Sequence, residues 1–193
     1  MKKHTARAFA ILGAVLVATA IVLVAASLIS QSVNRKEAEK LANTISSLIP
    51  QVNDGAPDGR HQTVMPALEI EGNDFCALLE APGYNVKLPV CNNWHKGNIN
   101  KFPHRFLGSM YDGSLVIGGS DNKGQMDFIT VISNGDKVCI TDVNGIRYTY
   151  QVSAVEKTKD VSSENLSGKS DLTLFARNSF GFDYTVVSCN IMN

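Results

Sequence analysis

An uncharged apolar stretch near the N-terminus divides the chain into two parts. Between Ala8 and Ser30 there is no charged side chain, and small or branched apolar residues dominate these 23 positions. As an α-helix this stretch would rise about 35 Å, enough to cross a hydrocarbon core of about 30 Å. The alanine and serine residues near its end also suit a cleaved signal peptide, but the apolar core of a signal peptide is usually only about 7–15 residues long. The sequence therefore favours an uncleaved transmembrane anchor, with the remainder of the chain outside the membrane.

The charges that flank this stretch predict its orientation. Lys2, Lys3 and Arg7 precede the apolar run. Positive residues beside a membrane-spanning helix favour the cytoplasmic side. We therefore expect residues 1–7 to be cytoplasmic, residues 8–30 to span the cell membrane once, and the C-terminal part to be extracellular.

Composition excludes some functions for the exported part. The 193 residues include 18 Lys or Arg and 18 Asp or Glu, which gives a net charge of zero and no basic surface for a nucleic acid. The cysteines stand at Cys76, Cys91, Cys139 and Cys189, without a Cys-x-x-Cys pair, so we expect no zinc site. They allow three disulfide connectivities, but packed free thiols are the favoured interpretation.

A helix and a linker are expected between the anchor and the main domain. Asn34 to Leu48 has a capping residue and a single apolar face, and Pro50 ends the pattern. Such a helix can bind a partner or dock on the core, but a stalk continuing from the membrane is the favoured interpretation. Residues 51–62 carry Asn-Asp-Gly and Pro-Asp-Gly turn signals and predict a flexible linker. Residues 31–63 are thus expected to be a stalk helix and linker, and residues 64–193 the globular domain.

Turn signals and short apolar runs predict that this domain is mainly β. The clearest hairpin runs from Lys137 to Val155 and turns at Asn144-Gly145, the strongest two-residue hairpin signal. Apolar residues alternate with polar ones after the turn, which fixes the strand register. Further strands are expected at 67–70, 75–80, 86–91, 114–118, 172–176 and 184–189.

Four stretches in order resemble the sortases, the cysteine transpeptidases of Gram-positive cell surfaces. The C-terminal stretch DLTLFARNSFGFDYTVVSC, Asp171 to Cys189, is similar to the family's strand–loop–strand signature, in which a Thr-Leu-x-Thr-Cys run ends on the nucleophile and an arginine begins the next strand. Three earlier stretches are similar to the strand ending in Pro-Val, the strand that delivers the catalytic histidine, and the Gly-Asp turn before the paired strands. They are VKLPV at 86–90, DGSLVIGGS at 112–120 and NGDKV at 134–138. The resemblance covers Met65 to Cys189 and implies a closed β-barrel of about eight strands with short helices, preceded by a transmembrane helix.

The resemblance also locates the family's three catalytic groups, and each is replaced. Ser120 stands at the histidine position, Arg177 at the nucleophile position and Tyr184 at the arginine position. Serine does not shuttle protons with a pKa near neutral, and a guanidinium has no lone pair for attack on a carbonyl. Tyrosine keeps one donor but loses the cation. We therefore predict that sortase chemistry is absent.

Chemistry rebuilt from other residues is the alternative. His95 and His104 lie in a stretch expected to be a loop, and a reactive Cys–His pair requires hydrogen-bond distance, about 3 Å. A solvated loop position is the favoured interpretation for each histidine. Asp121 and Asp183 adjoin the replaced positions and are groove candidates, either in ion pairs with Arg177 or in a recast site for a ligand.

The sequence therefore predicts a membrane-anchored, catalytically inactive sortase-like protein. We expect it to act as a binding or regulatory module in cell-surface protein sorting, with a sorting-signal peptide or a surface protein as partner. The alternatives are an active cysteine transpeptidase or hydrolase that uses a relocated cysteine, and a structural surface protein without a ligand. No metal or organic cofactor is expected, since Asp160 and Glu164 are too scattered for a calcium site.

Overall fold

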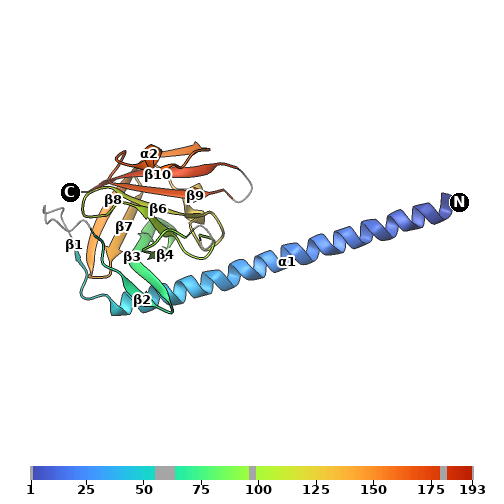
Figure 1. The fold of residues 1–193 in the computed structure, drawn as a ribbon, viewed down its shortest axis with the longest axis horizontal. Coiled ribbons are helices and arrows are strands. Elements are labelled where there is room, and N and C mark those ends of the chain that lie inside the picture. Colours follow the sequence, from blue (N-terminus) through green and yellow to red (C-terminus); the bar gives the residue numbers. More distant parts are fainter. Residues whose placement is uncertain (1, 55–63, 96–98, 179–181, 193) are drawn as a thin grey trace.

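The computed structural model describes residues 2–54, 64–95, 99–178 and 182–192. It consists of one long N-terminal helix that ends against a β-barrel (Figure 1). The long helix α1 spans Lys2–Leu48, and the short helices are η1 (Pro82–Tyr84), η2 (Asp127–Thr130) and α2 (Ser163–Leu166). The strands are β1 (Asn53–Asp54), β2 (Leu68–Ile70), β3 (Asn73–Ala81), β4 (Val86–Cys91), β5 (His104–Leu107), β6 (Leu115–Ser120), β7 (Lys137–Asp142), β8 (Ile146–Thr158), β9 (Leu172–Arg177) and β10 (Tyr184–Ile191).

Eight of these strands form a closed barrel. Their hydrogen-bonded order is β8-β10-β9-β6-β5-β4-β3, and β7 closes the ring because it pairs with both β3 and β8. The short strands β1 and β2 add to the outside of this ring on β8 and β3. The predicted closed barrel of about eight strands is thus confirmed.

The predicted hairpin forms the β7–β8 pair. Its turn contains Asn144 and Gly145, and Thr141 pairs with Arg147 directly beside it. Gly145 has φ of +86°, a value that favours glycine, which explains why the turn selects this residue. Tyr148, Tyr150 and Val152 are all buried in the barrel core, as their alternation predicts.

Strand β5 lies where the sequence suggested only a loop. It contains four residues and joins β4 to β6, pairing in parallel with the first and antiparallel with the second. Such a short strand carries little periodicity, so its existence follows from tertiary pairing rather than from local pattern.

The stalk interpretation of residues 34–48 is wrong. Helix α1 is continuous from the apolar segment, and its last turns dock on β3 and β4. Ala38, Leu41, Ala42 and Ile45 are fully buried in the main core. Their spacing at i, i+3, i+4 and i+7 gives one apolar face, and burying that face is more favourable than leaving it in water.

Polar contacts fix the same part of α1 along the barrel. Glu37 forms an ion pair with Lys101 at 2.6 Å, and Lys87 on β4 donates to Ser46 Oγ at 2.9 Å. The chain then leaves the helix and forms β1, parallel to β8. Most of the predicted linker, residues 55–62, lies outside the described residues.

The contacts of the docked helix show which end of the barrel faces the apolar segment. Near residue 35 the helix meets the loop that follows β6, where a Cβ on Gly124 would lie 2.6 Å from the Arg35 side chain. At residues 49–51 the chain instead meets the β7–β8 turn, where a Cβ on Gly145 would lie 3.0 Å from the carbonyl oxygen of Gln51. The barrel end formed by the last residues of β6 therefore faces the side from which the apolar helix departs (Figure 1).

The apolar part of α1 contrasts with the docked part. Its large side chains between Phe9 and Val33 are exposed, and the helix is long and apolar enough to cross a membrane by length and composition. An exposed apolar surface of this length is unfavourable in water.

Helix docking gives a stability prediction. Ile45 has 0% exposed surface, whereas Leu48, three residues later on the same helix, is 57% exposed. We expect Ile45→Ala to lower the free energy of unfolding by about 2–5 kcal/mol because it leaves a cavity between helix and barrel. Leu48→Ala is the matched control and should change it by less than about 1 kcal/mol. Denaturant unfolding of the full-length protein, followed by Trp94 fluorescence, measures both; equal effects would show that the helix is not part of the folded domain.

Candidate functional site

The three replaced positions meet in one row across neighbouring strands. Ser120 ends β6, Arg177 ends β9 and Tyr184 begins β10. Ser120 pairs with Arg177 in the parallel β6–β9 ladder, and Arg177 pairs with Tyr184 in the antiparallel β9–β10 ladder. Directly paired residues project from the same face of a sheet, so the row is continuous.

An aromatic cluster occupies the same face of this sheet. Phe175 lies two residues before Arg177, and its ring contacts Trp94, Phe106 and Tyr184 with centroids 5.3–6.1 Å apart. Val116 and Leu166 complete this second core, which is separate from the barrel interior. The face beneath the row is therefore filled by side chains instead of forming an open apolar groove.

Gly118 makes room for this filling. A Cβ at Gly118 would lie 2.2 Å from Phe175 Cζ, so only glycine lets the ring lie flat on β6. The sequence singled out Gly118 and Gly119 as the approach to the histidine position. The packing reason for Gly118 depends on a contact between strands 57 residues apart in sequence.

The three side chains of the row differ in their surroundings. Ser120 is buried, and its Oγ forms no hydrogen bond with any residue that the structure describes. Arg177 is exposed, and no ion pair among the described residues includes it. Tyr184 is half-buried with its ring on Phe175. The row thus offers a cation and two hydroxyls, but no thiol and no imidazole.

The two aspartates that adjoin the row line one cavity. Asp121 and Asp183 border an open cavity of about 510 Å³ at the same barrel end, together with Lys157, Asn178 and Thr185. A hydrogen bond from Asn178, with Lys157 nearby, lowers the pKa of Asp183 below its usual value, so this carboxylate is ionised at neutral pH. The expected pairing of these aspartates with Arg177 is not among the ion pairs of the described residues.

All four cysteines are free and buried. Burial raises the pKa of Cys76, of Cys91 and of Cys189 to about 12, which keeps these thiols protonated at neutral pH. Cys139 lies on β7, three strands from β9 around the ring, with Sγ 3.6 Å from Thr149 Oγ1. The favoured interpretation of packed thiols agrees with this arrangement.

The two histidines differ from each other. His95 is exposed, as expected, but the loop interpretation of His104 is wrong, because it is buried on β5 opposite Gly118. His104 Nδ1 lies 2.7 Å from the carbonyl oxygen of Asn93, and its ring lies near Trp94. Cys91 is its partner in the β4–β5 pair but belongs to the main core, and no hydrogen bond joins the two side chains.

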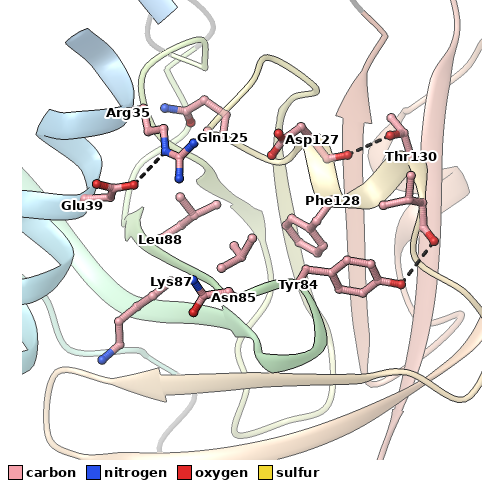
Figure 2. A pocket seen from close by; sticks show the side chains of 13 residues that line it. Arg35, Glu39, Tyr84, Asn85, Lys87, Leu88, Gln125, Asp127, Phe128 and Thr130 are labelled. Atoms are coloured by element: carbon pink, nitrogen blue, oxygen red, sulfur yellow. Dashed lines mark hydrogen bonds and ion pairs between the residues drawn. The ribbon is translucent and has the colours of Figure 1, made fainter. Parts of the chain in front are cut away.

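A second cavity at this end of the barrel had no sequence signal. It has a volume of about 460 Å³ and lies between α1, the start of β4 and η2 (Figure 2). Arg35 and Glu39 reach it from the helix, and Asp127 and Phe128 from the opposite side. Its lining comes from segments up to 96 residues apart (Arg35 to Val131), so no local motif announces it. No group of three or more metal-ligating side chains occurs in the described part of the chain.

Known proteins resemble this chain in structure but not detectably in sequence. No model of a known protein family matches the chain, and no curated protein matches it. Solved structures do match: a sortase D5 transpeptidase from Clostridium perfringens is 18% identical with a TM-score of 0.55, over 65% of this chain and 83% of that one. Sortase C1 from Streptococcus agalactiae is 18% identical with a TM-score of 0.54, over 66% of this chain and 71% of that one.

A third similar structure was solved with a peptide. Sortase E1 from Streptomyces coelicolor, with a tripeptide in its active site, is 13% identical with a TM-score of 0.52, over 62% of this chain and 88% of that one. At these identities the likeness is one of fold. The chain is therefore a mainly β protein with a sortase-like barrel behind an apolar N-terminal helix.

Proposed function

We propose that this protein is a membrane-anchored, catalytically inactive sortase-like module that binds a peptide or protein partner outside the cell. The observation that carries the proposal is the row of Ser120, Arg177 and Tyr184, in register across β6, β9 and β10. These are the positions at which the sortase resemblance implies a histidine, a cysteine and an arginine.

The chemistry of the row supports the inactive part of the proposal. Transpeptidation needs a thiolate nucleophile, a proton carrier with a pKa near neutral and donors for the oxyanion. Loss of the nucleophile alone from a catalytic triad can cost on the order of 10⁶ in turnover. Of these three requirements the row retains only hydrogen-bond donors, and Arg177 is the strongest of them.

The exposure of Arg177 supports the proposal that the protein binds a partner. A permanently charged guanidinium on the surface is suited to a carboxylate or to main-chain carbonyl oxygens of a bound peptide. One similar structure, the sortase E1 of Streptomyces coelicolor, was solved with a tripeptide in its active site. A sorting-signal peptide is therefore the partner that we propose, held beside the aromatic cluster and not cut.

The apolar helix supports the proposed location. Its exposed length suits a single membrane crossing, with the short charged N-terminus in the cytoplasm and the barrel on the cell surface.

Peptide assays with the full-length protein in detergent test this function. We expect candidate sorting peptides to be bound but neither cleaved nor transferred. Arg177→Gln should weaken binding about tenfold, because it removes a charge-assisted hydrogen bond, while Lys169→Gln, an exposed lysine away from the row, should not. Turnover that is lost on replacing one cysteine would overturn the inactive assignment, and absence of any peptide binding would leave a purely structural surface protein.

Thiol labelling separates the proposal from an enzyme with a relocated cysteine. Native protein at pH 7 should react slowly with iodoacetamide at all four cysteines, because each thiol is buried. Labelling of Cys76, Cys91 and Cys189 should increase only as the pH approaches their pKa of about 12 or as the protein unfolds, since only the thiolate reacts. Unfolded protein is the control and should label completely. One cysteine that reacts within minutes in the native state would instead identify a nucleophile.

A further inference from the structure

The cavity beside α1 presents two opposite charges that face each other without touching. Figure 2 shows the Arg35 guanidinium on the helix side and the Asp127 carboxylate on the η2 side. Asp127 contributes to a raised pKa of Arg35, after the larger effect of Glu39, yet no ion pair between described residues joins Arg35 to Asp127. Arg35 Nε donates to Glu39 at 2.8 Å, and its Nη groups are outside that bond.

A buried acceptor lies beside Arg35 in the cavity wall. Gln125 lines the cavity and is only 1% exposed, and its Oε1 accepts no hydrogen bond from any residue that the structure describes. The Nε2 of the same amide donates to the carbonyl oxygen of Lys101, which leaves Oε1 as the unsatisfied atom of the amide. An unsatisfied buried acceptor is unfavourable, and a hydrogen bond from a ligand donor would relieve it.

The remaining lining is mixed. Glu39 and Lys87 are also charged, but Glu39 is paired with Arg35 and Lys87 with Glu80. Leu88 and Phe128 are buried side chains of the cavity wall, and Val131 is 62% exposed. The cavity thus combines the facing charges of Arg35 and Asp127 and a neutral acceptor with a partly apolar surface.

The position of the cavity along α1 places it at the level of lipid headgroups. Arg35 follows Ser30, the last residue of the predicted membrane span, by five positions, a rise of about 8 Å. Headgroups occupy about 5–8 Å on each side of the hydrocarbon core. This step rests on the membrane anchorage in the proposed function.

We propose that the cavity binds the headgroup of a phospholipid that carries a primary amine, such as phosphatidylethanolamine. Arg35 takes the phosphate, while Asp127 and Gln125 Oε1 accept hydrogen bonds from the ammonium group. This assignment uses the two charges that face each other across the cavity, Arg35 and Asp127, and the unsatisfied oxygen of Gln125. A trimethylated amine has the same charge but no N–H donor, and an anionic glycerol headgroup leaves Asp127 uncompensated.

Binding of single lipids to the full-length protein tests the proposal. Native mass spectrometry in detergent compares phosphatidylethanolamine, phosphatidylcholine and phosphatidylglycerol of identical acyl chains. We expect the amine lipid to bind at least tenfold more tightly than the other two. Asp127→Asn should abolish that preference, and Arg35→Gln should weaken all three lipids because each has the phosphate.

Controls separate a specific site from general effects. Glu69→Gln removes an exposed carboxylate on β2 that does not line the cavity, and it should keep the preference. Unchanged thermal unfolding of Asp127→Asn without lipid would show that the variant is folded. Soluble phosphoethanolamine should compete, but more weakly than the lipid; equal or tighter binding would assign the cavity to a free phosphoamine and overturn the lipid assignment.

Two failures are distinguishable. Protein that does not float with liposomes contradicts the membrane anchor and with it the proposed function. Protein that floats but binds the three lipids equally contradicts only the headgroup site.

Discussion

The strand register across β6, β9 and β10 is the constraint on which the rest of the structure depends. The parallel β6–β9 ladder requires the long crossover that contains η2 and the β7–β8 hairpin, and the antiparallel β9–β10 ladder adds the third strand. Ser120 and Arg177 become neighbours although 57 positions separate them. A slip of one residue in either ladder would turn Phe175 toward the core and expose residues such as Leu174. Packing on both faces thus holds the row in place.

In the proposed function, this register also keeps the fold stable without the catalytic groups. The barrel core and the Phe175 cluster stabilise the strand ends whichever side chains occupy the row, because those side chains lie at the margin of both cores. The aromatic cluster over Gly118 fills the face of the sheet beside the row. A stable scaffold is therefore compatible with the loss of every reacting group, and function must be argued from the site rather than from the fold.

Local signals predicted much of the fold, and the resemblance to sortases identified the residues of the row. The Asn144-Gly145 turn, the alternation in β8 and the spacing of apolar runs are short-range patterns that directly express hydrogen bonding and burial. Helix docking was not predictable in this way, since an apolar face at positions 38, 41, 42 and 45 suits a stalk as well as a core. The burial of His104 and the cavity near Arg35 depend on segments that meet only after the barrel closes, so no local pattern contains them.

The central claim is that three positions retain catalytic geometry without catalytic groups. The most direct measurement installs those groups by combining Ser120→His, Arg177→Cys and Tyr184→Arg, and records the alkylation rate of the new thiol against pH. The single change Arg177→Cys is the reference. Our account predicts that the combined variant forms a thiolate at lower pH than the reference does, because an imidazole and a guanidinium then lie beside the sulfur. Identical pH profiles in the two variants would show that the row does not have the geometry of a catalytic site.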